Sequence, residues 1–133
     1  MSEVFKLEIV NPEKSFLSKD NVSEVVVPAI EGDMGILKDH ISIISFLKPG
    51  IVKIIDSGNT EENYFVEDGI IEFKDNSLSI LTSNIFDLKN IDKNNVKDML
   101  SKAEKRSEEK DLSDQNKYLI DQKIEVLKSL SLN

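Results

Sequence analysis

The spacing of apolar residues changes near Leu88, from every second residue to that of an amphipathic helix, and this change constrains the fold more than any other feature. Before it, Phe5, Leu7 and Ile9 share one face of a run whose other face is charged. Further short runs of β-branched and aromatic residues follow, separated by turns rich in glycine, proline and asparagine. Each such strand has one apolar face to bury, and two facing sheets bury them all. Residues 1–88 therefore predict an antiparallel β-sandwich or barrel domain.

After Leu88 the pattern predicts two short helices. Val96, Met99, Leu100 and Ala103 form one apolar stripe, and an aspartate at position 92 is suited to cap the first turn. A polar break around residues 110–115 precedes a second helix, which Asp111 or Ser113 can cap. Two short helices with a short link form an antiparallel hairpin, so we expect a helical domain over residues 89–133. The second helix is expected to bury some of six residues: Tyr118, Leu119, Ile120, Ile124, Leu127 and Leu130.

Composition and charge exclude several classes of function. Residues 1–90 carry 8 Lys against 16 Asp and Glu, whereas residues 91–133 carry 9 basic and 9 acidic side chains. The acidic front part argues against nucleic acid as a partner and fits a basic protein surface. The alternative is that the acidity only keeps the protein soluble. The chain has no cysteine, no apolar run long enough to insert into a membrane, and an N-terminus unlike a signal peptide.

An acidic segment with two glycines is the most distinctive local motif. Glu31, Gly32, Asp33, Met34 and Gly35 lie between apolar runs, and the one histidine of the chain follows at position 40. Two glycines three residues apart permit positive φ angles, so we expect a rigid, exposed loop suited to docking. A plain hairpin turn is the alternative. A lone histidine in a loop is more often a structural hydrogen-bonding residue than a ligand.

The residues needed for catalysis are not found. One histidine and no cysteine leave no Ser-His-Asp or Cys-His constellation, and no glycine-rich phosphate loop is present. Adjacent acids such as Glu61-Glu62 and Glu67-Asp68 fall in turns, where solvated carboxylates are ordinary. We therefore expect no catalytic residues, no cofactor and no metal, and we interpret the chain as a binding or coupling module.

Several blocks, in this order and spacing, resemble the epsilon subunit of F-type ATP synthases, which is called delta in mitochondria. The resemblance extends from about Phe5 to Ile85, and the helical tail matches in length and layout. The most specific part is a Glu-Gly-x-x-Gly-x-x-x-x-His block followed by Leu-Lys-Pro-Gly. The blocks are Val26-Val27-Pro28, Glu31 to Leu37 with His40, Leu47 to Val52, Tyr64-Phe65-Val66 before Asp68-Gly69, and Leu78 to Leu81.

The resemblance implies a ten-stranded β-sandwich joined to a helix hairpin, in a non-catalytic rotor subunit of a proton-translocating ATP synthase. Such a subunit couples the gamma subunit to the membrane rotor ring, peripheral to the cytoplasmic face of a bacterial inner membrane or its organellar equivalent. The segment Glu31 to Gly35 is where the family meets the ring. Asp33 occupies the position of the family's ring-contacting acid, with Glu31 and His40 beside it. Met34 offers an adaptable apolar contact. The hairpin offers a contact with the catalytic alpha and beta head.

The helical tail departs from the family in two ways. Many members bind ATP through an Ile/Leu-Asp-x-x-Arg-Ala motif, but here Asn95 and Val96 replace the arginine and alanine after Ile91-Asp92. Without the guanidinium a triphosphate loses its strongest donor, so we expect no tight ATP site. Inhibitory members carry basic residues in the second helix, whereas residues 113–133 hold three lysines and three acids. We therefore expect weak or absent inhibition of ATP hydrolysis.

Other functions predict features that can be checked. A free-standing β-sandwich binding module with a helical tail, the main alternative, should present an exposed aromatic platform, and the chain has two tyrosines and no tryptophan. A nucleotide-sensing regulator should carry the arginine that Asn95 replaces. An enzyme would need catalytic groups that the sequence does not offer.

Overall fold

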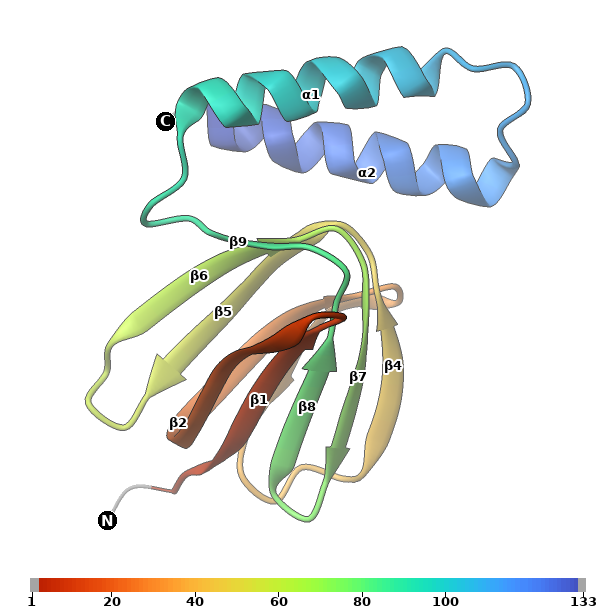
Figure 1. Cartoon of the computed structure of the whole chain (residues 1–133). Helices are drawn as coiled ribbons and strands as arrows, with labels where there is room; N and C mark the ends of the chain where they lie inside the picture. The colour runs from red at the N-terminus through yellow and green to blue at the C-terminus, as the bar shows by residue number, and fades with distance from the viewer. Residues whose placement is uncertain (1–2, 132–133) are drawn as a thin grey trace. The chain divides into compact units, whose positions relative to one another are not determined.

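Nine β-strands build the first part of the chain in the computed structural model, which describes residues 3–131 (Figure 1). The chain divides into two compact units, residues 1–89 and residues 90–133, and each is described by itself. The strands are β1 (Phe5–Asn11), β2 (Lys14–Ala29), β3 (Gly32–Ile36), β4 (Ile43–Leu47), β5 (Gly50–Asp56), β6 (Glu61–Val66), β7 (Gly69–Lys74), β8 (Ser77–Leu81) and β9 (Ile85–Asp87).

The strands are hydrogen-bonded in the order β1-β8-β7-β4-β2-β5-β6-β9, and β3 pairs with β2. The 16-residue β2 joins the two layers, because its first half pairs with β1 and its second half pairs with β3 and β5. Since β2 runs through both pairings without a break, the described residues contain nine strands rather than about ten. The pairings of the described strands are antiparallel as expected, with one exception: β1 and β8 are parallel.

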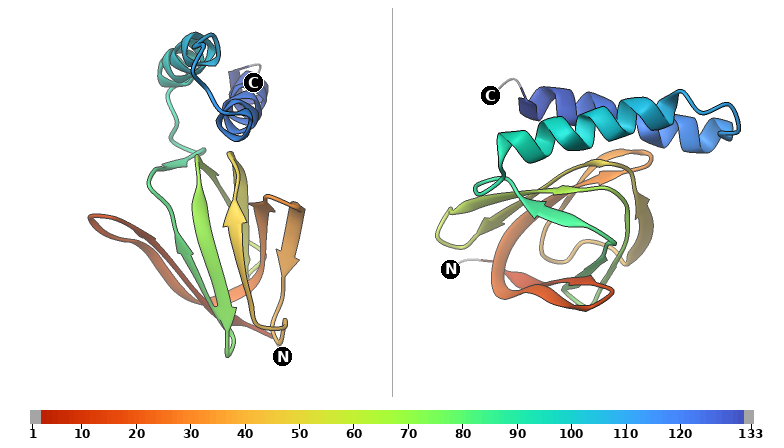
Figure 2. Two further views of the ribbon diagram at one scale, coloured as in Figure 1. Left: turned by 90° about the vertical axis from the view of Figure 1, so that its right-hand side faces the viewer. Right: turned by 45° about the horizontal axis from the view of Figure 1, so that its top comes forward.

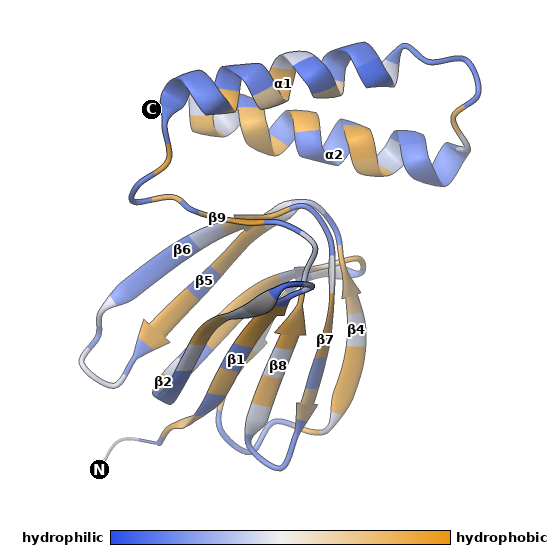
Figure 3. Ribbon diagram, in the orientation of Figure 1, coloured by the Kyte–Doolittle hydropathy of each residue, from blue (hydrophilic) through white to orange (hydrophobic). Residues whose placement is uncertain are grey.

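The core lies between the two layers and follows the period-two alternation of the strands. In β1 the first five residues alternate between buried and exposed, and β8 alternates in the same way (Figure 3). The buried side chains of both layers form one cluster, in agreement with the sandwich prediction. Its largest fully buried members include Leu7, Ile9, Ile36, Ile54, Ile71, Phe73, Leu78 and Ile80.

Two helices, α1 (Lys93–Ser107) and α2 (Asp114–Ser131), form the second unit and pack side by side as an antiparallel hairpin (Figure 2). Asp92 caps α1 as predicted, accepting a hydrogen bond from the Asn94 N–H at 2.9 Å. Of the two candidate caps for α2, the structure uses Ser113, whose Oγ accepts from the Asn116 N–H. The buried residues are Val96, Ala103, Ile120 and Leu127, whereas Tyr118 is exposed.

Candidate partner-binding surfaces

The acidic segment forms a tight hairpin between β2 and β3 rather than an extended loop. Ile30 and Glu31 make the turn, and Gly32 pairs with Ala29 at its base. Gly32 has a φ of +138°, a conformation that L side chains rarely adopt, and open space surrounds the position of its missing Cβ. Gly35 does not share this role, because it lies within β3 without a positive φ. The expectation that both glycines shape a loop is therefore wrong for Gly35.

The side chains of this hairpin face different environments. Asp33 is exposed on β3, and the Glu31 carboxylate accepts a hydrogen bond from Ser45 Oγ, with oxygen–oxygen distances of 3.2 and 3.3 Å. Met34 is half-buried and packs against the core cluster. The hairpin therefore offers two carboxylates at its surface, one of them already oriented by β4, while Met34 anchors the strand from inside.

His40 lies at the other end of β3, away from Glu31. The five residues of β3 alone span about 13 Å, and His40 follows in the loop beyond them. Its Nδ1 lies 2.7 Å from the Ile41 carbonyl oxygen, and its ring meets the edge of Phe73 with centroids 5.8 Å apart. These contacts give His40 the structural role that a lone loop histidine suggests. Its position beyond the far end of β3 keeps it apart from the acidic hairpin.

The loop that holds His40 is fixed by a reciprocal pair of hydrogen bonds. The Asp39 N–H donates to Asn76 Oδ1 at 2.7 Å, and Asn76 Nδ2 donates to Asp39 Oδ1 at 3.0 Å. Both residues have positive φ angles, 66° and 58°, which aspartate and asparagine tolerate better than most residues. This clamp ties the β3–β4 loop to the β7–β8 turn and makes that end of the sandwich rigid.

Five exposed apolar residues that the sequence pattern does not single out come together on one face of the sandwich. Ile30, Ile44, Phe46, Ile70 and Leu81 form an apolar patch on the outer side of β4, β7 and β8. Phe46 is 58% exposed and Ile44 is 66% exposed. The signal was present in the sequence: β4 and β7 carry apolar residues at both phases of the alternation, and β4 appears apolar along most of its length (Figure 3). A grouped apolar surface of this kind is typical of a protein–protein contact.

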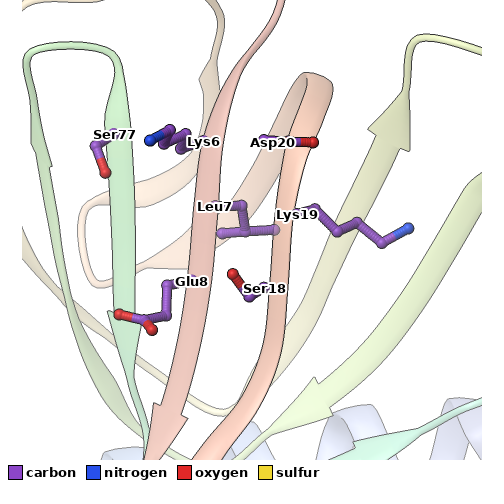
Figure 4. Close-up of a pocket in the computed structure, with 7 residues that line it drawn as sticks. All are labelled: Lys6, Leu7, Glu8, Ser18, Lys19, Asp20 and Ser77. Atoms are coloured by element: carbon purple, nitrogen blue, oxygen red, sulfur yellow. The ribbon is translucent and has the colours of Figure 1, made fainter.

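A hollow on the same side of the sandwich is polar. It lies between β1, β2 and β8 and is lined by Lys6, Glu8, Asp20 and neighbouring residues (Figure 4). Lys19 extends to the other side of β2 (Figure 4). It forms an ion pair there with Glu62. Within residues 3–131, no group of three His, Cys, Asp or Glu side chains could hold a metal ion. In the same residues, no helix is long and apolar enough to cross a membrane.

Comparison with known proteins identifies the relatives of this chain. Residues 4–87 match the family model for the ATP synthase delta/epsilon chain β-sandwich domain. The chain is 68% identical over 131 residues to the ATP synthase epsilon chain of Pelagibacter ubique, covering 98% of this chain and 100% of that one. It is 33% identical to the mitochondrial ATP synthase delta subunit of Pichia angusta, covering 96% of this chain and 79% of that one.

Solved structures share the fold. A chain in the mitochondrial ATP synthase of Euglena gracilis, solved as an OSCP/F1/c-ring assembly, superposes with a TM-score of 0.75 at 20% identity, over 99% of this chain and 81% of that one. A chain from the central stalk/c-ring part of the Tetrahymena thermophila enzyme gives 0.67 at 17% identity. Together with the nine-stranded sandwich and the helix hairpin, the family match and the 68% identity show that this chain belongs to the ATP synthase delta/epsilon chain family.

Proposed function

We propose that this chain is the non-catalytic central-stalk subunit that couples the gamma chain of an ATP synthase to its membrane rotor ring. Family membership supports the subunit assignment, because the relatives are ATP synthase epsilon and delta chains. The observation that carries the coupling role is the apolar patch, which lies on a rigid sheet and is exposed in the isolated chain. A stalk subunit needs such a surface, because it has to turn with its neighbour without slipping.

The apolar patch is the contact we assign to the gamma chain. Its members are 41% to 66% exposed, and completing the burial of such a side chain contributes about 1 kcal/mol. Several residues buried together around Phe46 give a tight joint. Because the patch spans three hydrogen-bonded strands, a force applied to it is transmitted through the whole sheet.

The β2–β3 hairpin is the contact we assign to the rotor ring, through Glu31, Gly32 and Asp33. Exposed carboxylates gain only about 0 to 1 kcal/mol each from a basic loop, so this contact needs several residues and a fixed shape. The Ser45 hydrogen bonds to Glu31 and the β2 pairing of β3 supply that fixed shape. Met34 and Gly35 support the hairpin from within β3, while His40 serves the clamped loop at its opposite end.

As a subunit of a membrane-embedded complex, the chain is peripheral, and we place it on the cytoplasmic face of a bacterial inner membrane or its organellar equivalent. The same proposal includes a contact of the helix hairpin, α1 and α2, with the catalytic alpha and beta head. We expect this contact to regulate ATP hydrolysis weakly or not at all. The free-standing binding module has no specific observation in its favour: within residues 3–131, the exposed large apolar side chains include only Phe46 and Tyr118 as aromatics.

The test is co-purification from native membranes. An affinity-tagged full-length chain should bring down the gamma chain first, and the ring and catalytic head with it. Phe46→Ser should lose the gamma chain, because it puts a hydroxyl at the centre of the apolar patch. Asp33→Lys should keep gamma and reduce the recovery of the ring. A wild-type chain that recovers no ATP synthase subunit would overturn the proposed function.

A further inference from the structure

The outer face of the β1-β8-β7-β4 layer is divided into rows that run across the strands. Strand register places Val10, Leu81, Ile70 and Phe46 side by side as one row, here the apolar row. The next row is Glu8, Ser79, Glu72 and Ile44, here the acidic row, and beyond it Lys6, Ser77 and Lys74 form the basic row. Successive rows are two residues apart along each strand, which is about 7 Å. Lys6, Glu8 and Ser77 are seen together in Figure 4.

Glu72 lies where the apolar and acidic rows meet. On β4 its neighbour across the strands is Ile44, and on its own strand Ile70 is the next residue on the same face. Ile44, Ile70, Glu72 and Leu81 line one shallow hollow. Among residues 3–131, the Glu72 carboxylate makes no hydrogen bond and no ion pair, although Lys74 is the next residue on the same face of β7.

A partner that covers the apolar row also covers Glu72. The carboxylate then loses water on one side, and removing an unpaired charge from water costs several kcal/mol. The basic row, with Lys6 and Lys74, lies about 7 Å away along the strands and forms no ion pair with Glu72, so a cation of the partner is placed to compensate that cost. An apolar partner surface would therefore be rejected, and one that carries a basic residue about 7 Å beside its apolar ridge would be accepted.

We propose that Glu72, assisted by Glu8, selects the partner of this face by pairing with a Lys or Arg of the gamma chain beside its apolar ridge. This inference rests on the proposed function, which names the gamma chain as the occupant. It adds a specificity-determining residue: the apolar row supplies contact area, and the acidic row sets register and excludes surfaces without a matching cation. The lysines of the basic row can pair with an acidic side chain of the same partner.

The experiment measures the affinity of the full-length chain for the purified gamma chain of the same ATP synthase, at low and high salt. Glu72→Gln removes the charge at nearly constant shape and should weaken binding about 30-fold, with a smaller salt dependence. Glu72→Lys should weaken it about 100-fold or more. Glu61→Lys, an equal change of net charge at an exposed position of β6, is the matched control and should stay within about twofold. Circular dichroism checks that each variant is folded.

The outcomes separate the two proposals. If the wild-type chain does not bind gamma, the proposed function fails. If the wild-type chain binds and Phe46→Ser does not, but Glu72→Gln and Glu72→Lys bind like wild type, the proposed function stands and the role of Glu72 is wrong. Rescue of Glu72→Lys by one Lys-to-Glu or Arg-to-Glu substitution in gamma identifies the paired residue. Failure of every such substitution to rescue it would also overturn the proposal.

Discussion

At the scale of single residues, one polar cluster ties β2 to β6 where the two strands share no backbone pairing. Lys19 pairs with the Glu62 carboxylate, Tyr64 donates its hydroxyl hydrogen to the same group at 2.5 Å, and Phe16 packs edge-on against the Tyr64 ring. The hydrogen bonds from Lys19 and Tyr64 hold the pKa of Glu62 below its ordinary value. Burial and the neighbouring carboxylate raise the pKa of Tyr64.

These shifts predict a pH-dependent effect of Glu62→Gln. A lowered folded-state pKa means that the carboxylate stabilises the fold above about pH 4.5 and that this contribution is lost as pH falls through the folded pKa. At pH 7 the substitution should lower the free energy of unfolding by about 1 kcal/mol. As pH falls below 4.5, the difference from wild type should shrink. Urea unfolding of both proteins at pH 7 and at pH 3 is the measurement, with exposed Glu61→Gln as the control, and an equal difference at both values would contradict the prediction.

In the Leu-Lys-Pro-Gly motif, the role of Gly50 differs from the one that its sequence context predicts. The sequence marks Gly50 as a turn residue, yet the structure places it at the start of β5 without a positive φ. Its role is close approach: a Cβ at this position would lie 2.5 Å from Pro28 Cβ. That contact joins residues 22 positions apart in the sequence, so no local pattern predicts it.

At the scale of elements, period and capping chemistry predicted both helices, because their signals are local. Asp92 was identified as the cap of α1, and Ser113 was one of two candidates for α2. The strands were also predicted by alternation, but their partners were not. The parallel pairing of β1 with β8 depends on contacts between residues about 70 positions apart, and alternation along one strand carries no information on its neighbours.

The start of α1 supports the prediction that the chain has no tight ATP site. The Asp92 carboxylate caps the helix, and the exposed position 95 on that turn carries asparagine, a neutral amide, where the family motif has arginine. Isothermal titration of the full-length chain with Mg-ATP should give no binding tighter than about 1 mM. Asn95→Arg is the informative variant, because it restores the fork-shaped donor. Micromolar binding by the wild-type chain would contradict the prediction.

At the scale of the whole molecule, the sequence located the acidic hairpin but not the face beside it. Glu31 and Asp33 stand out because they flank Gly32 in one short segment, whereas Phe46, Ile70 and Leu81 come from three strands and meet only through register. A one-residue slip in any of these strands would turn its outer residues into the core. The apolar row and Glu72 therefore became visible only once the pairing of β4, β7 and β8 was known.

The two-unit organisation predicts that the sandwich works without the hairpin. The residues of the core cluster lie between Phe5 and Ile80, so removing residues 90–133 takes away none of them. The fragment of residues 1–89 should fold, bind gamma and support ATP synthesis. Because α2 carries balanced charges and no basic stripe, its removal should also raise ATP hydrolysis by less than about twofold. Hydrolysis by ATP synthase reconstituted with the fragment or with the full chain is the measurement. A several-fold release of hydrolysis, from a fragment that still binds gamma, would show that the hairpin inhibits.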